Sequence, residues 1–343
     1  MLKKSIIYIS LGLLTVAGVF AFLTYQAIFG KNIELPDNGY TLELAPNTSL
    51  EQLSTRLYEE GILLNTKKLE LTAKLMKYGS NIRTGRFQLS DINSNVELIR
   101  FLRTGSQATT QLVLNNVRTL EDLSGKIASF ILADSLEVLE VLTAPETSET
   151  FGTNLENVMS YFIPNTYEIY WSETPQDIVF RMKKEHQKFW RTNNRLEAAK
   201  TLGLSPEEVY TLASIVEKET NQDQEKSKMA GTLLNRLNIN MALQADPTAI
   251  FATRDFTAKR VLNKHTQFDS PYNTYMYPGL PPGPIAMASI SSIDAVLNPA
   301  EHQYLYYCAK GDGSGLHNFA TNLRGHNRNS KIYVQNLKKR GKR

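Results

Sequence analysis

The stretch SPEEVYTLASIVEKET, residues 205–220, contains the clearest helix start in the chain and, in its EKET end, two carboxylates spaced two positions apart. Ser205 suits the N-cap position, Pro206 the first helical position, and Glu208 completes a capping box. Three local signals therefore begin the helix at the same place. The sequence predicts a helix that runs from here into the EKET motif.

The two glutamates of EKET face different directions on this helix. At about 100° per residue, the apolar side chains form one stripe, made of Val209, Leu212, Ala213 and Val216 with Ile215 on its flank. Glu219 projects between Leu212 and Ile215, whereas Glu217 lies on another side of the helix. A carboxylate on the apolar side loses hydration in its charged form, so its pKa rises toward the range of a general acid. We therefore predict Glu219 as the candidate acid; the alternative is a buried structural glutamate paired with Arg236.

The sequence after this helix is rich in Asn, Tyr, Gln, Gly and Pro without helical or strand periodicity, which is typical of catalytic loops. PGLPPGP, residues 278–284, cannot continue a helix or a central strand, so it forms a stiff path able to border a groove. Rings and amides suit sugars, whose faces are apolar and whose edges are polar. Side chains of this kind are Tyr272, Asn273, Tyr275 and Gln244.

Asp246, in LQADPT, is the one tempting second carboxylate. As a residue before Pro247, it is expected mainly as a turn residue whose side chain caps the backbone. In a functional role it would orient Gln244, Asn235 or a substrate. We expect the other nearby acids, Glu217 and Glu225, to be solvated or paired on helix surfaces.

The N-terminus contains an uncharged stretch from Ser5 to Phe29. As a helix it would span about 37 Å, enough to cross a hydrocarbon core of about 30 Å. Lys3 and Lys4 precede it, so the positive-inside rule places the N-terminus in the cytoplasm. No clear cleavage site closes the stretch, and we favour an uncleaved anchor over a signal peptide.

The composition excludes several classes of protein. With 38 basic and 34 acidic side chains the net charge is +4, and no basic face indicates nucleic-acid binding; the tail LKKRGKR is expected as a solvated helix end. A single cysteine, Cys308, excludes an internal disulfide and a cysteine-based zinc site, and we expect it to be buried. Five histidines without a His-Glu-x-x-His pattern make a metal site improbable, so neither a metal nor a cofactor is expected.

The fold class predicted is α+β, with cytoplasmic residues 1–4, a transmembrane helix over 5–29, a linker over 30–39, a small domain over 40–106 and a larger domain over 107–343. A capping box of Ser49 with Gln52 and glycine stops at Gly61, Gly79 and Gly105 predict, in the small domain, a strand, two helices, a strand and a further helix. The larger domain opens with a strand and with a helix capped by Thr119 and Asp122. Residues 174–200 are expected as one long amphipathic helix.

Several motifs in series resemble one known family. LASIVEKET, NRL, LQ-x-DPT, SPYNTY, GLPPGPIA, NPA, YLYY and GDG occur in the order and spacing of the YceG-like endolytic murein transglycosylases. The resemblance covers most of residues 108–337 and implies a catalytic glutamate at Glu219. It also implies a lysin-motif-like small domain and a single-pass enzyme in the bacterial cytoplasmic membrane, with its catalytic domain outside the cytoplasm. The implied substrate is nascent peptidoglycan, cut near peptidoglycan synthases.

The resemblance implies a reaction in which one carboxyl group acts first as acid and then as base, so that the 6-hydroxyl of N-acetylmuramic acid replaces water. We expect catalysis by Glu219 and substrate contacts from Asn235, Arg236, Gln244, Asp246, Thr248, Tyr272, Asn273, Tyr275 and His317. One alternative is a peptidoglycan hydrolase that uses Glu219 and Asp246 as two carboxylates. Another is a peptidoglycan-binding scaffold without activity, against which the intact EKET motif argues.

Overall fold

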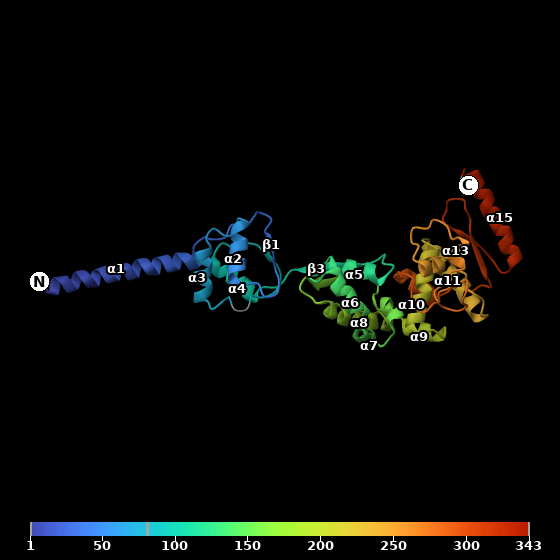
Figure 1. Ribbon diagram of the computed structural model, residues 1–343, viewed down its shortest axis with the longest axis horizontal. Helices are drawn as coiled ribbons and strands as arrows, with labels where there is room; N and C mark the ends of the chain where they lie inside the picture. Colours follow the sequence, from blue (N-terminus) through green and yellow to red (C-terminus); the bar gives the residue numbers. More distant parts are fainter. Residues whose placement is uncertain (1, 80–81, 342–343) are drawn as a thin grey trace. The chain divides into compact units, whose positions relative to one another are not determined.

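The computed structural model describes residues 2–79 and 82–341 (Figure 1). Contacts divide the chain into two units, one ending at Gln111 but including Glu168–Glu173, and one made of Leu112–Tyr167 and the residues from Thr174 onward. Helices predominate, and the strands of the described residues form three two-stranded sheets. The fold class is therefore α+β, as the sequence predicts.

The N-terminal helix α1 (Leu2–Phe29) contains the uncharged stretch Ser5–Phe29, and the side chains of that stretch are almost all exposed. Its length and composition are those of a helix that can cross a membrane. An exposed surface that is apolar on all sides is explained by a lipid environment, because in water it would be driven into a protein core. Met1 and the side chains of residues 2–4 lie outside the described part, and with them the two lysines used for the orientation.

The end of α1 belongs to the core of the first unit. Ala27 is buried, and its carbonyl accepts hydrogen bonds from Thr72 Oγ1 at 3.0 Å and from Asn95 Nδ2 at 2.7 Å. Asn32 and Ile33, in the segment expected as a linker, are also fully buried. The chain is therefore anchored to the unit on both sides of the point where the helix ends.

The first unit pairs a small sheet with three helices. Strand β1 (Tyr40–Leu44) runs antiparallel to β2 (Gly85–Leu89), with Leu42 opposite Phe87. The helices are α2 (Leu50–Glu59), α3 (Thr66–Leu75) and α4 (Asn95–Thr104). Capping boxes at the starts of α2 and α4 confirm the predicted helix starts. The order of elements is the predicted one, while the likeness to a lysin motif remains a prediction.

The second unit is mainly helical. Its elements are α5 (Leu120–Ala128), α6 (Ser135–Thr143), α7 (Pro145–Phe151), the 3-10 helix η1 (Leu155–Tyr161), α8 (Pro175–Arg191), α9 (Arg195–Thr201), α10 (Pro206–Glu219), α11 (Asp223–Asn238), α12 (Asp246–Thr253), α13 (Asn263–Thr266), α14 (Ile290–Leu297), β5 (Tyr306–Ala309), β6 (His317–Ala320) and α15 (Leu323–Lys339). Two further strands, β3 (Thr109–Leu114) and β4 (Asn165–Tyr170), are each divided between the two units. Strand β3 pairs with β4, and β5 with β6. Lys342 and Arg343, in the basic tail, lie outside the described residues.

The prediction of one long helix over residues 174–200 is wrong. The chain forms α8 and α9 instead, because Asn193 and Asn194 adopt left-handed backbone conformations with φ of 55° and 58°. Asparagine tolerates this conformation better than other residues with a side chain. The apolar periodicity continues across the break, so it does not reveal the turn.

Helix α10 lies at the centre of the second unit and begins with the predicted capping box of Ser205 and Glu208. All residues from Val209 to Val216 are buried, so the helix is enclosed on every side rather than along one stripe. Helices α11 and α14 pack against it; Figure 1 shows α10 and α11 together in the yellow part of the chain. The buried surroundings make α10 a fixed support for the groups at its C-terminal end.

A hairpin of β5 and β6 packs against α15 near the end of the chain (Figure 1). Tyr307 stands opposite Phe319 in this antiparallel pair. The next residue of β5, Cys308, is a free and partly exposed cysteine, not the buried side chain expected. It sits on a two-stranded sheet without enough layers around it to enclose both faces.

Candidate active site

One cavity of about 540 Å³ lies at the C-terminal end of α10. Side chains from α10, α11, α12, the loop before α14, the β5–β6 hairpin and α15 surround it. They are Glu219, Arg236, Gln244, Asp246, Tyr275, Tyr306, Tyr307, Cys308, Ala309, His317, Leu323, His326 and Tyr333. The wall is rich in rings and contains two carboxylates. A concave wall that combines rings with convergent polar groups is typical of ligand sites.

Glu219 is the last residue of α10 and faces this cavity. Burial raises the pKa of its carboxyl group from 4.5 to about 8; the negative charge of Asp246 adds to the rise, while the Tyr307 hydrogen bond and the charge of Arg236 oppose it. Glu219 therefore holds its proton at neutral pH, as a general acid must. The expected inward orientation and raised pKa are both present in the structure.

Tyr307 binds Glu219 directly. Its hydroxyl donates to Glu219 Oε1 at 2.9 Å, which fixes one oxygen of the carboxyl group and leaves Oε2 for the acidic proton. Burial and the neighbouring Glu219 raise the pKa of Tyr307 well above its ordinary value, so the phenol keeps its proton. The tyrosine thus acts as a hydrogen-bond donor throughout the neutral range.

Arg236 does not form the ion pair considered as an alternative for Glu219. Its guanidinium donates to the backbone carbonyls of Leu305 at 2.5 Å, Leu243 at 2.5 Å and Ala242 at 3.3 Å. Within residues 2–79 and 82–341, no ion pair joins it to Glu219. Arg236 instead ties α11 to the chain before β5 and before α12, and its charge acts on Glu219 only from a distance.

Asp246 lies at the start of α12 and is exposed at the cavity. It accepts a hydrogen bond from the Tyr275 hydroxyl at 2.5 Å. The N-cap position of α12 is occupied by Ala245, which makes Asp246 the first residue of the helix, and in the described part of the chain its side chain binds a phenol instead of capping the backbone. Its partner is Tyr275 rather than Gln244 or Asn235.

Gln244 reaches the cavity through a strained backbone with φ of 47°. Its backbone N–H donates to the carbonyl of Thr274 at 3.0 Å, which holds the segment before α12 against the SPYNTY loop. The amide side chain is exposed and so is free to meet a ligand.

His317, at the start of β6, also lines the cavity. Its Nδ1 lies 3.0 Å from Glu225 Oε2, and its backbone N–H donates to both oxygens of Glu225 at 3.0 and 3.1 Å. Glu225 is only 7% exposed, so the expectation of a solvated or surface-paired residue is wrong. Nothing in the sequence, other than its position in the helix, indicated that Glu225 would be buried against His317.

Four residues expected to contact substrate are outside the cavity wall, because their side chains are engaged by other parts of the protein. Asn235 donates to the carbonyls of His302 and Tyr304, and buried Asn273 donates to three loop carbonyls between residues 265 and 268. Buried Thr248 bonds to Thr274 Oγ1 at 2.7 Å, and Tyr272 packs on Phe251. They shape the loops that carry Gln244, Asp246 and Tyr275.

The sequence left part of the cavity wall unassigned. Tyr306, Tyr307 and Cys308 come from β5, while His326 and Tyr333 come from α15. The YLYY motif was a signal for the tyrosines, but strand alternation would direct the consecutive Tyr306 and Tyr307 to opposite faces, so it did not predict that both line the cavity. Nothing in the sequence placed α15 beside the cavity.

Glu217 serves the structure on the other side of α10. Its Oε2 accepts from Ser289 Oγ, from Ser292 Oγ at 2.5 Å and from Lys226 Nζ at 3.3 Å. Burial alone would raise its pKa, but these serine hydrogen bonds and the lysine charge outweigh it and lower the pKa. Glu217 is therefore an ionised anchor for the N-terminus of α14, whose N-cap is Ser289.

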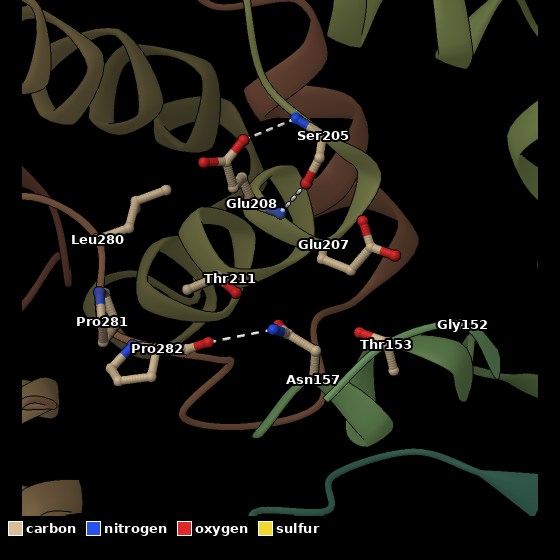
Figure 2. Close-up of a pocket in the computed structure, with 10 residues that line it drawn as sticks. All are labelled: Gly152, Thr153, Asn157, Ser205, Glu207, Glu208, Thr211, Leu280, Pro281 and Pro282. Atoms are coloured by element: carbon tan, nitrogen blue, oxygen red, sulfur yellow. Dashed lines mark hydrogen bonds between the residues drawn. The ribbon is translucent and has the colours of Figure 1, made fainter. Parts of the chain in front are cut away.

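A second cavity of about 440 Å³ lies at the opposite end of α10 (Figure 2). Two carboxylates reach it, but both are engaged: Glu208 in the helix capping box and Glu207 as acceptor for Tyr161 at 3.1 Å. The proline loop borders it, with Pro282 bonded to Asn157. Neither carboxylate is left without a partner there, so the candidate acid–base site is the one at Glu219. Nor do the described residues contain three or more His, Cys, Asp or Glu side chains grouped to hold a metal ion.

Comparison with known proteins shows what the chain as a whole is similar to. The model of the YceG-like family matches residues 42–332. An endolytic murein transglycosylase from Bacillus subtilis (strain 168) is 28% identical over 328 residues, which cover 90% of this chain and 89% of that protein. An endolytic murein transglycosylase from Streptococcus pneumoniae (serotype 2, strain D39) is 25% identical over 358 residues, which cover 94% of this chain and 64% of that protein.

A solved structure is also similar. The crystal structure of a YceG-like protein from Listeria monocytogenes aligns with a TM-score of 0.58 at 24% sequence identity, covering 85% of this chain and 99% of that one. At this identity the likeness concerns the fold.

Proposed function

The chain belongs to the YceG-like family, and from this premise we propose that it is an endolytic murein transglycosylase that cuts peptidoglycan glycan strands between N-acetylmuramic acid and N-acetylglucosamine. The observation that carries the proposal is the cavity at the end of α10, where Glu219 keeps its proton at neutral pH and Tyr307 holds one of its oxygens. Relatives over nearly the whole chain carry the same name.

In the first step Glu219 donates its proton to the oxygen that links the two sugars. The bond from the anomeric carbon of N-acetylmuramic acid to this oxygen breaks, and positive charge develops on the ring, as in other glycosidic cleavages. The raised pKa of Glu219 supports this step, since only a protonated carboxyl group can donate. The N-acetylglucosamine leaves with the proton.

In the second step the ionised Glu219 acts as base. It accepts the proton of the 6-hydroxyl of N-acetylmuramic acid while that oxygen bonds to the anomeric carbon. The product ends in 1,6-anhydro-N-acetylmuramic acid, no water is consumed, and Glu219 regains its proton. One carboxyl group with a pKa of about 8 suits both steps, because it is neither a strong acid nor a strong base near neutral pH.

Asp246 is the basis of the alternative, a hydrolase with two carboxylates. Its oxygen receives the Tyr275 hydroxyl at 2.5 Å, and its exposure does not isolate it as a second buried acid. Its negative charge contributes to the raised pKa of Glu219. We therefore propose an electrostatic and orienting role for Asp246, together with substrate contacts from Gln244, Tyr275 and His317.

The helix α1 anchors the enzyme in the membrane. We propose the cytoplasmic (inner) membrane with the N-terminus inside, because Lys3 and Lys4 precede the apolar stretch. The second unit then meets nascent strands outside the cytoplasm and limits their length near the peptidoglycan synthases. We further propose that the first unit, for which the sequence predicts a lysin-motif-like domain, holds the strand.

The test is the chemistry of the ends produced from purified glycan strands. Mass spectrometry should find 1,6-anhydro ends, one water lighter than hydrolysed ends. Glu219→Gln should lower turnover by roughly 10²- to 10⁴-fold, and Asp246→Asn by less. Ordinary reducing ends would favour the two-carboxylate hydrolase, and uncut strands that still bind would favour the scaffold.

A further inference from the structure

Glu225 forms an unusual pair of contacts with one residue of the cavity wall. Its carboxylate oxygens accept the backbone N–H of His317 at 3.0 and 3.1 Å, and Oε2 also lies 3.0 Å from the ring nitrogen Nδ1. The side chains of the two residues are 9% and 11% exposed. A buried carboxylate is costly unless its oxygens receive hydrogen bonds, so this arrangement specifies the position of His317 closely.

The contact also selects the tautomer of His317. An ionised carboxylate only accepts hydrogen bonds, so Nδ1 must carry the proton that faces Glu225. Within the described residues, no hydrogen bond reaches Nε2 of His317. In the neutral ring this second nitrogen is an acceptor. The ring lines the same cavity as Glu219 and lies edge-on to Tyr307, with centroids 6.0 Å apart.

We propose that Glu225 is a positioning residue that holds His317 as the Nδ1–H tautomer and so presents Nε2 as acceptor to a hydroxyl or acetamide N–H of the bound sugar. The inference rests on the proposed function for the identity of the ligand. Sugars offer many donors, and although Gln244 and Asp246 also bring acceptor oxygens to this cavity, tyrosine rings form much of its wall. An oriented acceptor therefore adds specificity that the rings alone do not supply.

Glu225→Gln tests the tautomer directly. The amide oxygen can still accept the backbone N–H of His317, while the amide N–H can donate to Nδ1 and move the ring proton to Nε2. Nitrogen-15 NMR of the histidine-labelled full-length protein in detergent distinguishes the two tautomers and the imidazolium. We expect Nδ1–H for His317 in the wild type and Nε2–H in the variant. An imidazolium or an Nε2–H ring in the wild type would overturn the proposal.

The kinetic arm uses soluble glycan strands. Losing one substrate hydrogen bond should raise KM roughly ten- to hundredfold with kcat nearly unchanged, because a contact made equally in ground and transition states affects binding alone. His317→Phe leaves the backbone contact to Glu225 in place and should raise KM by the same factor. The double variant, Glu225→Gln with His317→Phe, should raise KM no further, because both changes remove the same contact. Additive losses, or a loss in kcat alone, would contradict the proposal. Glu301→Gln, at an exposed site with the same charge change, is the matched control.

Binding separates this inference from the proposed function. In a Glu219→Gln background, strand affinity should fall by the same ten- to hundredfold on adding Glu225→Gln. If the wild type binds strands without cutting them, the proposed transglycosylase activity is refuted. The affinity measurement still decides whether Glu225 positions His317 for binding. If strand affinity is unchanged although the tautomer has moved, the acceptor role is refuted. Urea unfolding of each variant identifies any that fail to fold, and His317→Phe then decides alone.

Discussion

Replacing Glu219 by Gln should make the second unit more stable at neutral pH, although it removes the acid. In the folded wild type, burial moves the pKa of Glu219 from 4.5 to about 8. Between these values the folded state keeps the proton and the unfolded state has lost it. Unfolding then releases a proton, so wild-type stability falls as pH rises. The contribution of Glu219 to the free energy of unfolding is fully present below its pKa in the unfolded state. It is lost as the pH rises through its pKa in the folded state.

The size of the effect follows from the pH window. Each pH unit is worth at most about 1.4 kcal/mol, so a window from about pH 5 to about pH 7.5 gives about 3.4 kcal/mol. Glu219 lies on the wall of an open cavity and is partly exposed, and solvent screening reduces the expected change to about 2–3 kcal/mol. Glutamine fills nearly the same volume and does not titrate. The free energy of unfolding of the variant therefore does not decrease over this pH window on account of residue 219.

Urea unfolding of the wild type and of Glu219→Gln, at about pH 5 and at about pH 7.5, measures how the difference in their free energies of unfolding changes with pH. Trp190 is buried in the core that surrounds α10, and Trp171→Phe would make it the one fluorescent tryptophan of the chain. The stability gap between Glu219→Gln and wild type should widen by about 2–3 kcal/mol from the lower to the higher pH. Parallel pH dependences would show that Glu219 titrates normally, and the argument for a buried acid would fail.

Two other changes test the surroundings of this site, and a third tests the first unit. Tyr307→Phe removes the hydrogen bond that opposes the rise in the pKa of Glu219, so the alkaline limb of the pH–rate profile should move to higher pH; an unchanged limb would contradict the role of this contact. Glu217→Gln should leave that limb in place and destabilise the fold by about 1–3 kcal/mol, a penalty that should shrink toward acid pH in urea titrations because the pKa of Glu217 is lowered. A chain that begins at residue 31 should unfold in its first unit at lower urea than one that begins at residue 25, since it lacks the Ala27 carbonyl that binds Thr72 and Asn95; equal midpoints would disprove that coupling.

Helix starts were predictable because their chemistry is local. Ser49, Thr119 and Ser205 each form a capping box with the residue three positions later, as their sequences predict. The strand and helix order of the first unit follows from such signals. Burial of α10 on all sides was not predictable, since its second face is covered by segments distant in sequence, such as Ile285, whose N–H donates to Ser214 Oγ at 3.0 Å.

The polar loop residues show why a candidate site can be only partly predicted from composition. Asn273 and Gln244 are both amide side chains in irregular sequence, and both suit a sugar ligand. Asn273 is fully buried and its Nδ2 binds loop carbonyls, whereas Gln244 is exposed at the cavity. The amide needed to bind a sugar is the same amide needed to satisfy a buried backbone, so only the fold separates the two uses.

The two glutamates of EKET show how one helix end can support opposite protonation states. Their spacing of two residues turns them by about 200° around the helix, so they meet different neighbours. Glu217 receives two serine hydroxyls and a lysine, which keep it ionised; Glu219 receives one phenol, and burial together with the charge of Asp246 keeps it protonated. Glu217 stabilises the start of α14, which packs on α10 and so holds the helix that carries Glu219. The ionised glutamate thereby fixes the scaffold on which the protonated one can act as an acid.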